Sequence, residues 1–430
     1  MRAMTIKTAA FMLLLLLAVM TKIYPQQHAA TWDLEQLIEE ALQNNPAYRS
    51  AVYQAQQVNQ TISQAGALPD PILGLSVMNL PVDNFAFDLE PMTGKKLSLM
   101  QVFPFPGKLK LKENMAGYQA QVVEQQVEEL KNDLIKNVKL MYYEIFYLDK
   151  SIEILNINQT LLQQLVTVAE KKYSVGKGLQ QDVLKARVEH AKISDKLISL
   201  QQKRKNAVFK LNKLLNRNIS QSFEKIKIVD KPAIDYYSSD LKALGLEHRP
   251  ILKTWRLLIE KSKSGNKLAK LDYLPDFRVG IAYTQRDDLR SGMKIPDFFS
   301  AELQLDLPLY FYKKQSKKVQ ETQLKIRSLE DSYIAIKNEV FFEIENAITE
   351  IEKNTRLIEL YKTNILPQAS QSLNSAMSGY QFDKVDFLTL LNNQLTLYGY
   401  ELEHYFVFTA LLKNFAELEA AVGISLENNF

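Results

Sequence analysis

Histidine and methionine side chains are the residues of this 430-residue chain that most directly suggest metal chemistry. Of the four histidines, only His404 has a metal-site spacing, because Glu401 and His404 form one E-x-x-H on a predicted helix. A di-iron helical site needs two such motifs and further inward glutamates, and the sequence has no second copy. We therefore interpret the pair as a surface or interface contact. The eleven methionines are scattered, which favours core or barrel packing over a copper path.

The chain contains no cysteine, which removes several further kinds of chemistry. Disulfides, thiolate metal sites, a cysteine nucleophile and lipidation through an N-terminal cysteine are all excluded. No Gly-rich phosphate loop and no G-x-S-x-G elbow occurs. We therefore expect no enzyme, no cofactor and no resident metal. The 53 basic and 49 acidic residues nearly balance, so we also expect no nucleic-acid partner.

The N-terminus predicts a secretory signal peptide over residues 1–26. Arg2 and Lys7 precede an apolar run, Ala9 to Met20, that is too short to span a bilayer. An N-terminal anchor helix is the alternative. No later apolar run approaches 18 residues, so we expect membrane contact to be peripheral or made by β-strands.

Four landmarks recur in the same order about half the chain apart, which predicts a tandem duplication. The pairs are Asn45-Pro46 with Arg249-Pro250, Leu68-Pro69-Asp70 with Leu274-Pro275-Asp276, Pro104 with Pro308, and Tyr173 with Tyr380. We expect repeat 1 over residues 31–216, a linker over 217–238, repeat 2 over 239–423 and a C-terminal tail over 424–430.

Each repeat is predicted to contain short helices, a β-hairpin and two long helices. In repeat 1 we expect helices over 33–66, strands over 71–80 and 95–104, and long helices over 108–172 and 179–215. In repeat 2 we expect helices over 240–271, strands over 275–286 and 298–309, and long helices over 313–378 and 384–422.

The strands alternate between apolar and polar residues, most clearly from Phe277 to Thr284. Aromatic residues gather near their ends, and this pattern is typical of a transmembrane barrel. A half-buried soluble sheet fits the alternation equally well. Because four strands cannot close a barrel, several chains must share one if these are barrel strands.

The long helices carry apolar seams with coiled-coil spacing. The first seam steps by four and three residues through Leu134, Val138, Met141, Ile145, Leu148, Ile152 and Leu155. The second repeats it 206 residues later, from Val340 to Tyr361. Apolar residues off the seam predict packing on two sides, as in a ring of helices. A soluble coiled-coil rod explains the seams but not the strands.

With these elements in place, the chain resembles the TolC family of outer-membrane efflux proteins, most of all its heavy-metal and cation branch, the CusC/CzcC-like members. The motifs that carry the resemblance run along nearly the whole mature chain. They are Ala41-Leu42 with Asn45-Pro46, Leu68-Pro69-Asp70-Pro71, Gln101-Val102-Phe103-Pro104-Phe105-Pro106-Gly107-Lys108, Tyr173-Ser174-Val175-Gly176 with Asp182-Val183-Leu184, and Leu307-Pro308-Leu309-Tyr310.

The resemblance implies a mainly α fold with transmembrane β, in which a homotrimer forms a 12-stranded β-barrel and an α-helical periplasmic tunnel. It implies an outer-membrane conduit of a tripartite efflux system, located in the outer membrane with a periplasmic extension. Its partners would be a periplasmic membrane-fusion adaptor, an inner-membrane RND-type pump and outer-membrane lipid. Metal cations are one candidate substrate, and drugs or proteins are another. A soluble periplasmic coiled-coil scaffold or adaptor is the alternative from a different class.

The resemblance also places a periplasmic entrance at the tips of the long helices. By motif match, Asp182 and Asp386 are its acidic positions, one per repeat, where carboxylates would attract cations. Capping or first-turn charge at a helix start is the alternative role for both. Tyr173 and Tyr380 are the tip tyrosines, and Tyr380 is a linking residue.

The entrance departs from the family pattern in three places. Asp383 stands where the second-repeat motif has a glycine. Thr389 stands where a second acidic ring would lie. Lys384 is the nearest cation to an arginine link that the chain lacks.

Prolines mark the predicted barrel-to-helix junctions. Pro104 and Pro106 break both the strand and the helix in repeat 1, and Gly107 relaxes the backbone beside them. Repeat 2 keeps only Pro308, so we expect the two junctions to differ. Four lysines from Lys313 to Lys318 follow that second junction, where they would meet lipid headgroups or form a solvated helix face.

Overall fold

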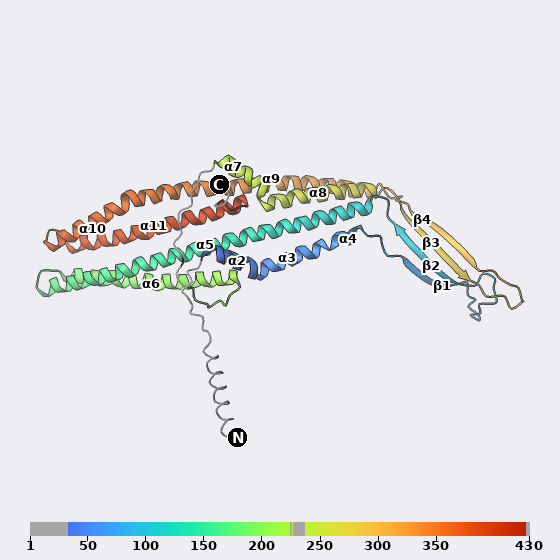
Figure 1. The fold of residues 1–430 in the computed structure, drawn as a ribbon, viewed down its shortest axis with the longest axis horizontal. Helices are drawn as coiled ribbons and strands as arrows, with labels where there is room; N and C mark the ends of the chain where they lie inside the picture. The colour runs from blue at the N-terminus through green and yellow to red at the C-terminus, as the bar shows by residue number, and fades with distance from the viewer. Residues whose placement is uncertain (1–32, 224–225, 227–236, 427–430) are drawn as a thin grey trace, which may run out of the picture.

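The computed structural model describes residues 33–223, 226 and 237–426. The expected signal peptide, most of the expected linker and the last four residues of the tail lie outside the described residues. The described chain is an extended rod of helices with a small β-sheet at one end (Figure 1). The fold is mainly α with a small antiparallel sheet, as predicted.

Repeat 1 holds five helices and two strands among its described residues. They are α2 (Leu34–Asn44), α3 (Pro46–Asn59), α4 (Thr61–Gly66), β1 (Ile72–Met78), β2 (Gly94–Phe103), α5 (Lys108–Ser174) and α6 (Gln180–Leu215). The stretch expected as helical over 33–66 is therefore three helices. The chain breaks at Asn45, whose side chain accepts bonds from the backbone N–H groups of Ala47 and Tyr48 and so caps α3.

Repeat 2 follows the same order. Its elements are α7 (Ser238–His248), α8 (Pro250–Leu271), β3 (Asp276–Gln285), β4 (Phe298–Asp306), α9 (Gln315–Leu360), a π-helical segment η1 (Tyr361–Ile365), α10 (Leu366–Gln381) and α11 (Phe387–Val422). The strand expected to reach residue 309 ends at Asp306, because Pro308 cannot donate to a β-ladder.

The long helix expected over 313–378 runs without a gap through α9, η1 and α10, but its π-helical turn was not predicted. The apolar seams of the two repeats match at an offset of 206 residues up to Tyr361, whereas Tyr173 and Tyr380 are 207 apart. Repeat 2 therefore holds one extra residue between these landmarks. A π-turn takes up more residues than an α-turn, so η1 absorbs the insertion without a break in the helix. Pro367 lies in the first turn of α10, directly after η1.

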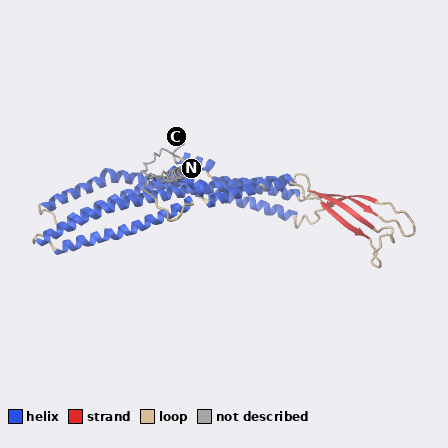
Figure 2. Ribbon diagram, turned by 60° about the horizontal axis from the view of Figure 1, so that its bottom comes forward, coloured by secondary structure: helices blue, strands red, loops and turns tan. Residues whose placement is uncertain are grey.

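The four strands form one antiparallel sheet in the order β1-β2-β3-β4, so the central pair β2–β3 joins the two repeats (Figure 2). Register aligns apolar side chains across the sheet. One row is Leu75, Leu97, Tyr283 and Phe299, and the next is Leu73, Leu99, Ile281 and Ala301. Large residues on this face are exposed, whereas Gly280, Ala282 and Thr284 on the other face are buried. The predicted alternation is confirmed, and the bulky apolar side chains face outward.

The core is a line of apolar clusters along the helical rod rather than one centre. Helix α5 packs against α6, α8 and α11 along its length. The predicted seam positions Leu134, Val138, Ile145, Leu148 and Leu155 are buried. Each fully buried aliphatic side chain contributes roughly 1.5–3 kcal/mol, so the seams dominate the stability of the rod.

In the part of the chain that the structure describes, no helix is both long enough and apolar enough to cross a bilayer.

Candidate functional site

The two helical turns farthest from the sheet lie at the same end of the rod (Figure 1). One joins α5 to α6 and the other joins α10 to α11. Both have the same backbone, with a left-handed residue at Gly176 (φ 76°) in the first and at Asp383 (φ 57°) in the second. The N–H groups of Lys177 and Lys384 each donate to a carbonyl five residues earlier, at 2.8 Å. These are Schellman-type helix ends, and they place the two tips in equivalent conformations.

Asp383 occupies a position that favours glycine, because most side chains avoid a positive φ. Aspartate tolerates it better than most residues. Its carboxylate forms an ion pair with Lys172 of α5, and Lys172 Nζ also donates to the carbonyl of Tyr380 at 3.2 Å. The same ammonium lies 4.1 Å from the centre of the Tyr380 ring. We call this contact of Lys172, Tyr380 and Asp383 the tip link, and it joins the two repeats of one chain.

The structure separates the two tip tyrosines. Tyr380 is buried, and its ring meets Phe387 edge-on at 5.8 Å between centroids. Burial raises the pKa of the Tyr380 hydroxyl, an effect that Lys172 opposes and that Asp182 and Asp383 reinforce. Tyr173 is about half exposed and makes none of these contacts. The contacts of Tyr380 therefore support the linking role expected for it. The role of Tyr173 at the entrance stays a prediction.

The two predicted acidic positions differ in local role. Asp386 is the N-cap of α11, where Oδ1 accepts the backbone N–H of Thr389 at 2.6 Å. That bond and a second from the Thr389 hydroxyl hold the pKa of Asp386 below its ordinary value. Asp182 lies half-buried in the first turn of α6. The helix-start role is thus present at both positions, and carboxylate charge at the tips remains compatible with it.

Sequence reasoning missed Lys172. We expected Lys384 to be the nearest substitute for the missing arginine, but Lys384 is exposed and the cation in the link comes from the other repeat. The pairing of Lys172 with Asp383 raises the pKa of the lysine and lowers that of the carboxyl, in both cases chiefly through their hydrogen bond. The sequence feature that pointed to this ion pair was Asp383, an acidic residue at a position where the motif has glycine.

The first strand-to-helix junction, predicted as a barrel-to-helix junction, is tied to repeat 2 by the buried charge of Lys108. Gly107 has φ 94° and ends the strand-to-helix turn. Lys108, next in the chain, is buried and pairs with Asp276 at 3.0 Å and Asp272 at 3.3 Å. Asp276 also accepts the backbone N–H of Phe105, between the two prolines, at 2.7 Å. This junction spans four residues from β2 to α5, as the paired prolines suggested.

The second junction is longer and different. Eight residues, 307–314, separate β4 from α9, with Pro308 near the start. Pro308 is the counterpart of Pro104, whereas this junction has no counterpart of Pro106 or Gly107. The expected asymmetry of the two junctions is therefore present in the backbone.

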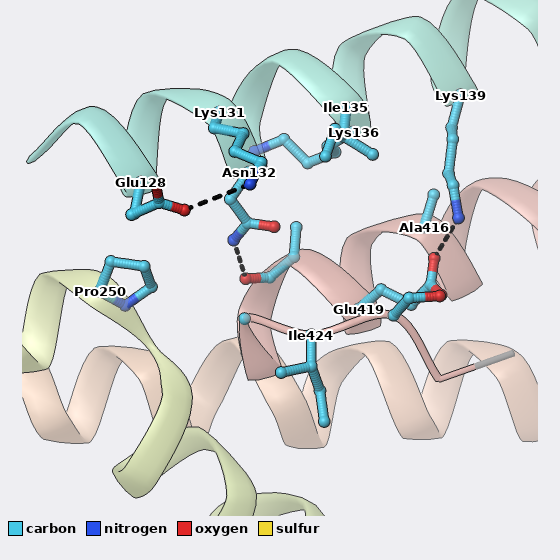
Figure 3. Close-up of a pocket in the computed structure, with 13 residues that line it drawn as sticks. Glu128, Lys131, Asn132, Ile135, Lys136, Lys139, Pro250, Ala416, Glu419 and Ile424 are labelled. Carbon is cyan, nitrogen blue, oxygen red and sulfur yellow. Dashed lines mark hydrogen bonds and ion pairs between the residues drawn. The ribbon is translucent and has the colours of Figure 1, made fainter. Parts of the chain in front are cut away.

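Midway along the rod, the repeats meet at a hollow of about 220 Å³ between α5, α8 and the end of α11 (Figure 3). Lys139 of α5 reaches Glu419 of α11 at 2.6 Å, and both side chains are buried. The other oxygen of Glu419 accepts the backbone N–H of Leu426 at 2.9 Å. Asn132 donates to the carbonyl of Ala420 at 2.7 Å. The polar groups of the hollow thus pair with one another. We therefore infer that they hold the segment after α11 in place and do not bind a ligand.

No group of three or more potential metal-ligating side chains occurs within residues 33–223, 226 and 237–426. His404 lies against aromatic rings, 5.5 Å from Tyr405 and 6.3 Å from Tyr361 between centroids. Burial lowers the pKa of His404 and raises that of Glu401. In both side chains the shift has burial as its main cause, which fits a pair packed between helices.

Known proteins share the fold described above. Residues 37–217 match the family model described as outer membrane efflux protein. The cobalt-zinc-cadmium resistance protein CzcC of Cupriavidus metallidurans is 18% identical over 385 residues, which cover 88% of this chain and 87% of that protein. The chain is therefore similar to outer-membrane efflux proteins, through the family model in repeat 1 and through CzcC along most of its length. The family model matches repeat 1, and repeat 2 reproduces its order of elements.

Two solved structures, of CusC and of the outer membrane protein VceC, share the whole fold. The crystal structure of CusC is similar with a TM-score of 0.78 at 17% identity, covering 91% of this chain and 92% of CusC. That of VceC from Vibrio cholerae gives 0.78 at 18% identity, covering 92% of this chain and 97% of VceC. At such low identity these likenesses establish the fold, including both repeats and the sheet.

Proposed function

We propose that this protein is the outer-membrane channel of a tripartite efflux system. The observation that carries the proposal is the sheet, which exposes a face of aligned leucine, isoleucine and aromatic side chains at one end of the rod. Water-exposed apolar faces of this extent are unfavourable, whereas the same face suits lipid. The match of residues 37–217 to the family model described as outer membrane efflux protein supports the same role.

The open sheet also supports a trimer. Strands β1 and β4 each pair on one side only, so their outer edges can join those of a neighbouring copy. Two copies would give eight strands, a barrel whose interior side chains fill. Three copies give twelve strands and a lumen, with the polar faces of the sheets inside. The rods of the three copies would continue this lumen as a helical tunnel through the periplasm.

The role is transport, and the energy would come from an inner-membrane pump of the RND type through a periplasmic adaptor. The printed name of CzcC concerns resistance to cobalt, zinc and cadmium. We extend this to metal cations as the substrate class of the present channel. Drugs or proteins remain the competing cargo.

Two measurements test the proposal. Membrane fractionation should place the protein in the outer membrane, and the mass of the detergent-solubilised protein should be that of a trimer. A protein recovered in the soluble periplasmic fraction would overturn the proposal in favour of a coiled-coil scaffold. That second candidate explains the helical rod but leaves the exposed apolar sheet in water.

For the entrance, we propose that Asp182 and Asp386 of three chains form acidic rings that favour cations. Their positions at the two tips and their carboxylate charge support this assignment. The variant D182N/D386N removes the charge while asparagine keeps the capping ability at Asp386. Cation preference in a planar-bilayer recording should fall, whereas D331N on the exposed surface of α9 should leave it unchanged. Equal selectivity in the double variant and the wild type would refute the rings.

A further inference from the structure

The turn after β4 exposes apolar side chains in an ordered conformation. We call residues 307–314 the rim turn. Its exposed members are Leu307, Leu309, Tyr310, Phe311 and Tyr312, each more than half exposed. Backbone bonds fix the turn, including Lys314 N–H to the Tyr310 carbonyl at 3.0 Å and Ser316 N–H to the Phe311 carbonyl at 2.9 Å. The exposure is therefore part of the folded structure, and it needs an apolar environment to be favourable.

Unpaired positive charge lies directly beside these rings. Of the four lysines from Lys313 to Lys318, Lys318 pairs with Glu321 at 2.9 Å. In the described chain no carboxylate lies within ion-pair distance of the other three, Lys313, Lys314 and Lys317, which we call the rim lysines. Positive charge near the start of a helix is destabilising, so helix stability does not explain them.

The rim lysines border a hollow of about 1030 Å³ between the rim turn and the end of α8. Its acidic side chains already have partners. Asp306 pairs with Arg278 at 2.9 Å, and Asp272 and Asp276 share the single charge of Lys108. The three rim lysines outnumber the one carboxylate charge left uncompensated, so the net charge in the hollow is positive. The volume of the hollow is at the upper end of typical small-ligand sites.

The rim turn continues the apolar face of the sheet, because Leu303 and Leu305 of β4 lie exposed just before it. We propose that the rim turn and the rim lysines bind the headgroup of an anionic phospholipid in the periplasmic leaflet. The aromatic rings would lie at the boundary between acyl chains and headgroups, and the lysines would contact the lipid phosphate. The proposal rests on the proposed outer-membrane location.

A second copy of the chain is a less suitable occupant. Lysine is depleted at protein interfaces because its ammonium loses hydration there, and an acidic partner would be needed for each rim lysine. A phospholipid headgroup supplies negative charge while it stays hydrated. The corresponding lysine of repeat 1, Lys108, is buried and paired, so each chain has one such site and a trimer would have three.

The test compares lipid retention by purified full-length protein. The trimer is equilibrated in detergent with equal amounts of phosphatidylglycerol and phosphatidylethanolamine, and native mass spectrometry counts the lipids retained. Wild type should prefer phosphatidylglycerol. The variant K313Q/K314Q/K317Q should lose about tenfold or more of that preference, since each lysine near an anionic surface contributes roughly fivefold. The variant K313R/K314R/K317R keeps the charge and should keep the preference.

A matched control removes the same charge elsewhere. K203Q/K210Q/K213Q changes three exposed lysines of α6 and should retain lipid as wild type does. The proposal is overturned if both glutamine variants behave alike, if soluble glycerol phosphate displaces the lipid, or if the rim variant loses the trimer and so identifies a contact between copies. A wild-type protein absent from the outer membrane would overturn the proposed function as well. An outer-membrane trimer without lipid preference would overturn this inference alone.

Discussion

The two repeats of this protein share one order of elements but differ in the regularity of the long helix and in the passage from strand to helix. Repeat 1 runs through α5 as 67 uninterrupted residues, whereas repeat 2 covers the same path as α9, η1 and α10. Repeat 1 passes from strand to helix in four residues with its lysine buried, and repeat 2 takes eight with its lysines exposed. The two repeats thus share one frame, and the extra residues of repeat 2 change its long helix and its strand-to-helix junction.

The largest expected effect concerns the segments that follow the two return helices. Glu419 and its repeat-1 counterpart Asn212 both hold the chain beyond the helix, Asn212 through the carbonyls of Ile219 and Gln221. Only Glu419 also neutralises a buried lysine, Lys139. Glu419→Ala should therefore lower the free energy of unfolding by about 3–5 kcal/mol. Asn212→Ala should lower it by about 1–3 kcal/mol.

Thermal or urea unfolding followed by helical circular dichroism measures both variants. Removing both charges in K139M/E419L should recover much of the loss, because an apolar pair leaves no charge buried alone. If Glu419→Ala and Asn212→Ala lower the free energy of unfolding equally, the ion pair of Glu419 with Lys139 adds nothing to stability.

The next effect tests the extra residue of repeat 2. Deleting Lys362 from η1 should force a regular α-helix through Pro367, which costs about 3 kcal/mol because proline removes a bond and clashes with the preceding turn. Because η1 absorbs the extra residue, the deletion restores the spacing of repeat 1 and should leave Tyr380 and Asp383 facing Lys172. Single-channel conductance should therefore stay near the wild-type value.

A second change tests the proline separately. Adding Pro367→Ala to the deletion should restore stability, with conductance still near the wild-type value. A leaky entrance in the deletion variant would mean that η1 does not absorb the extra residue.

A smaller effect is expected at the tip link itself. Lys172→Gln should weaken the contact between the repeats and increase basal conductance modestly. Asp383→Gly should do the same although it relieves the positive φ, so its stability should not fall. Because the wild type has no cysteine, K172C/D383C can be bridged by a bifunctional thiol reagent without background reaction. Bridging should reduce conductance, and unchanged conductance in all three variants would remove the link from the gating mechanism.

The smallest effect is the pH dependence of the same link. The folded-state pKa of Asp383 lies below its ordinary value of 3.8, so the link is complete above that value and is lost as pH falls through the lowered pKa. At high pH it persists beyond the ordinary lysine value of 10.5, because the pKa of Lys172 is raised. Conductance should therefore be flat near neutrality and rise only in strong acid. Lys172→Gln should flatten the acid response.

Local pattern predicted much of this fold, because seams and alternation report which faces are buried or exposed. Leu134 and Ile344 recur at helical spacing, and Val279 and Ile281 at strand spacing, whatever their distant partners. The pairing of β2 with β3 was not predicted, since register between distant strands leaves no local trace. The π-turn was visible only as a change of offset from 206 to 207, which we did not interpret.

The candidate site was less predictable for the same reason. Motif matching located Tyr380, Asp182 and Asp386, because they lie at fixed distances from helix ends. It failed for Lys172, whose partner is 211 residues away. Long-range ion pairs depend on how two tips are brought together, and one sequence does not contain that information.

The β2–β3 pairing has a consequence for how the molecule is made. Each hairpin closes a short loop and can form early, but more than 170 residues separate Phe103 from Asp276, where the two hairpins meet. Closing so long a loop is entropically costly and slow unless something else draws its ends together. Contacts of α8 with α5 provide that, since these helices run back to the same end of the rod. Assembly should therefore proceed from the helices to the sheet, so that the apolar face is completed last.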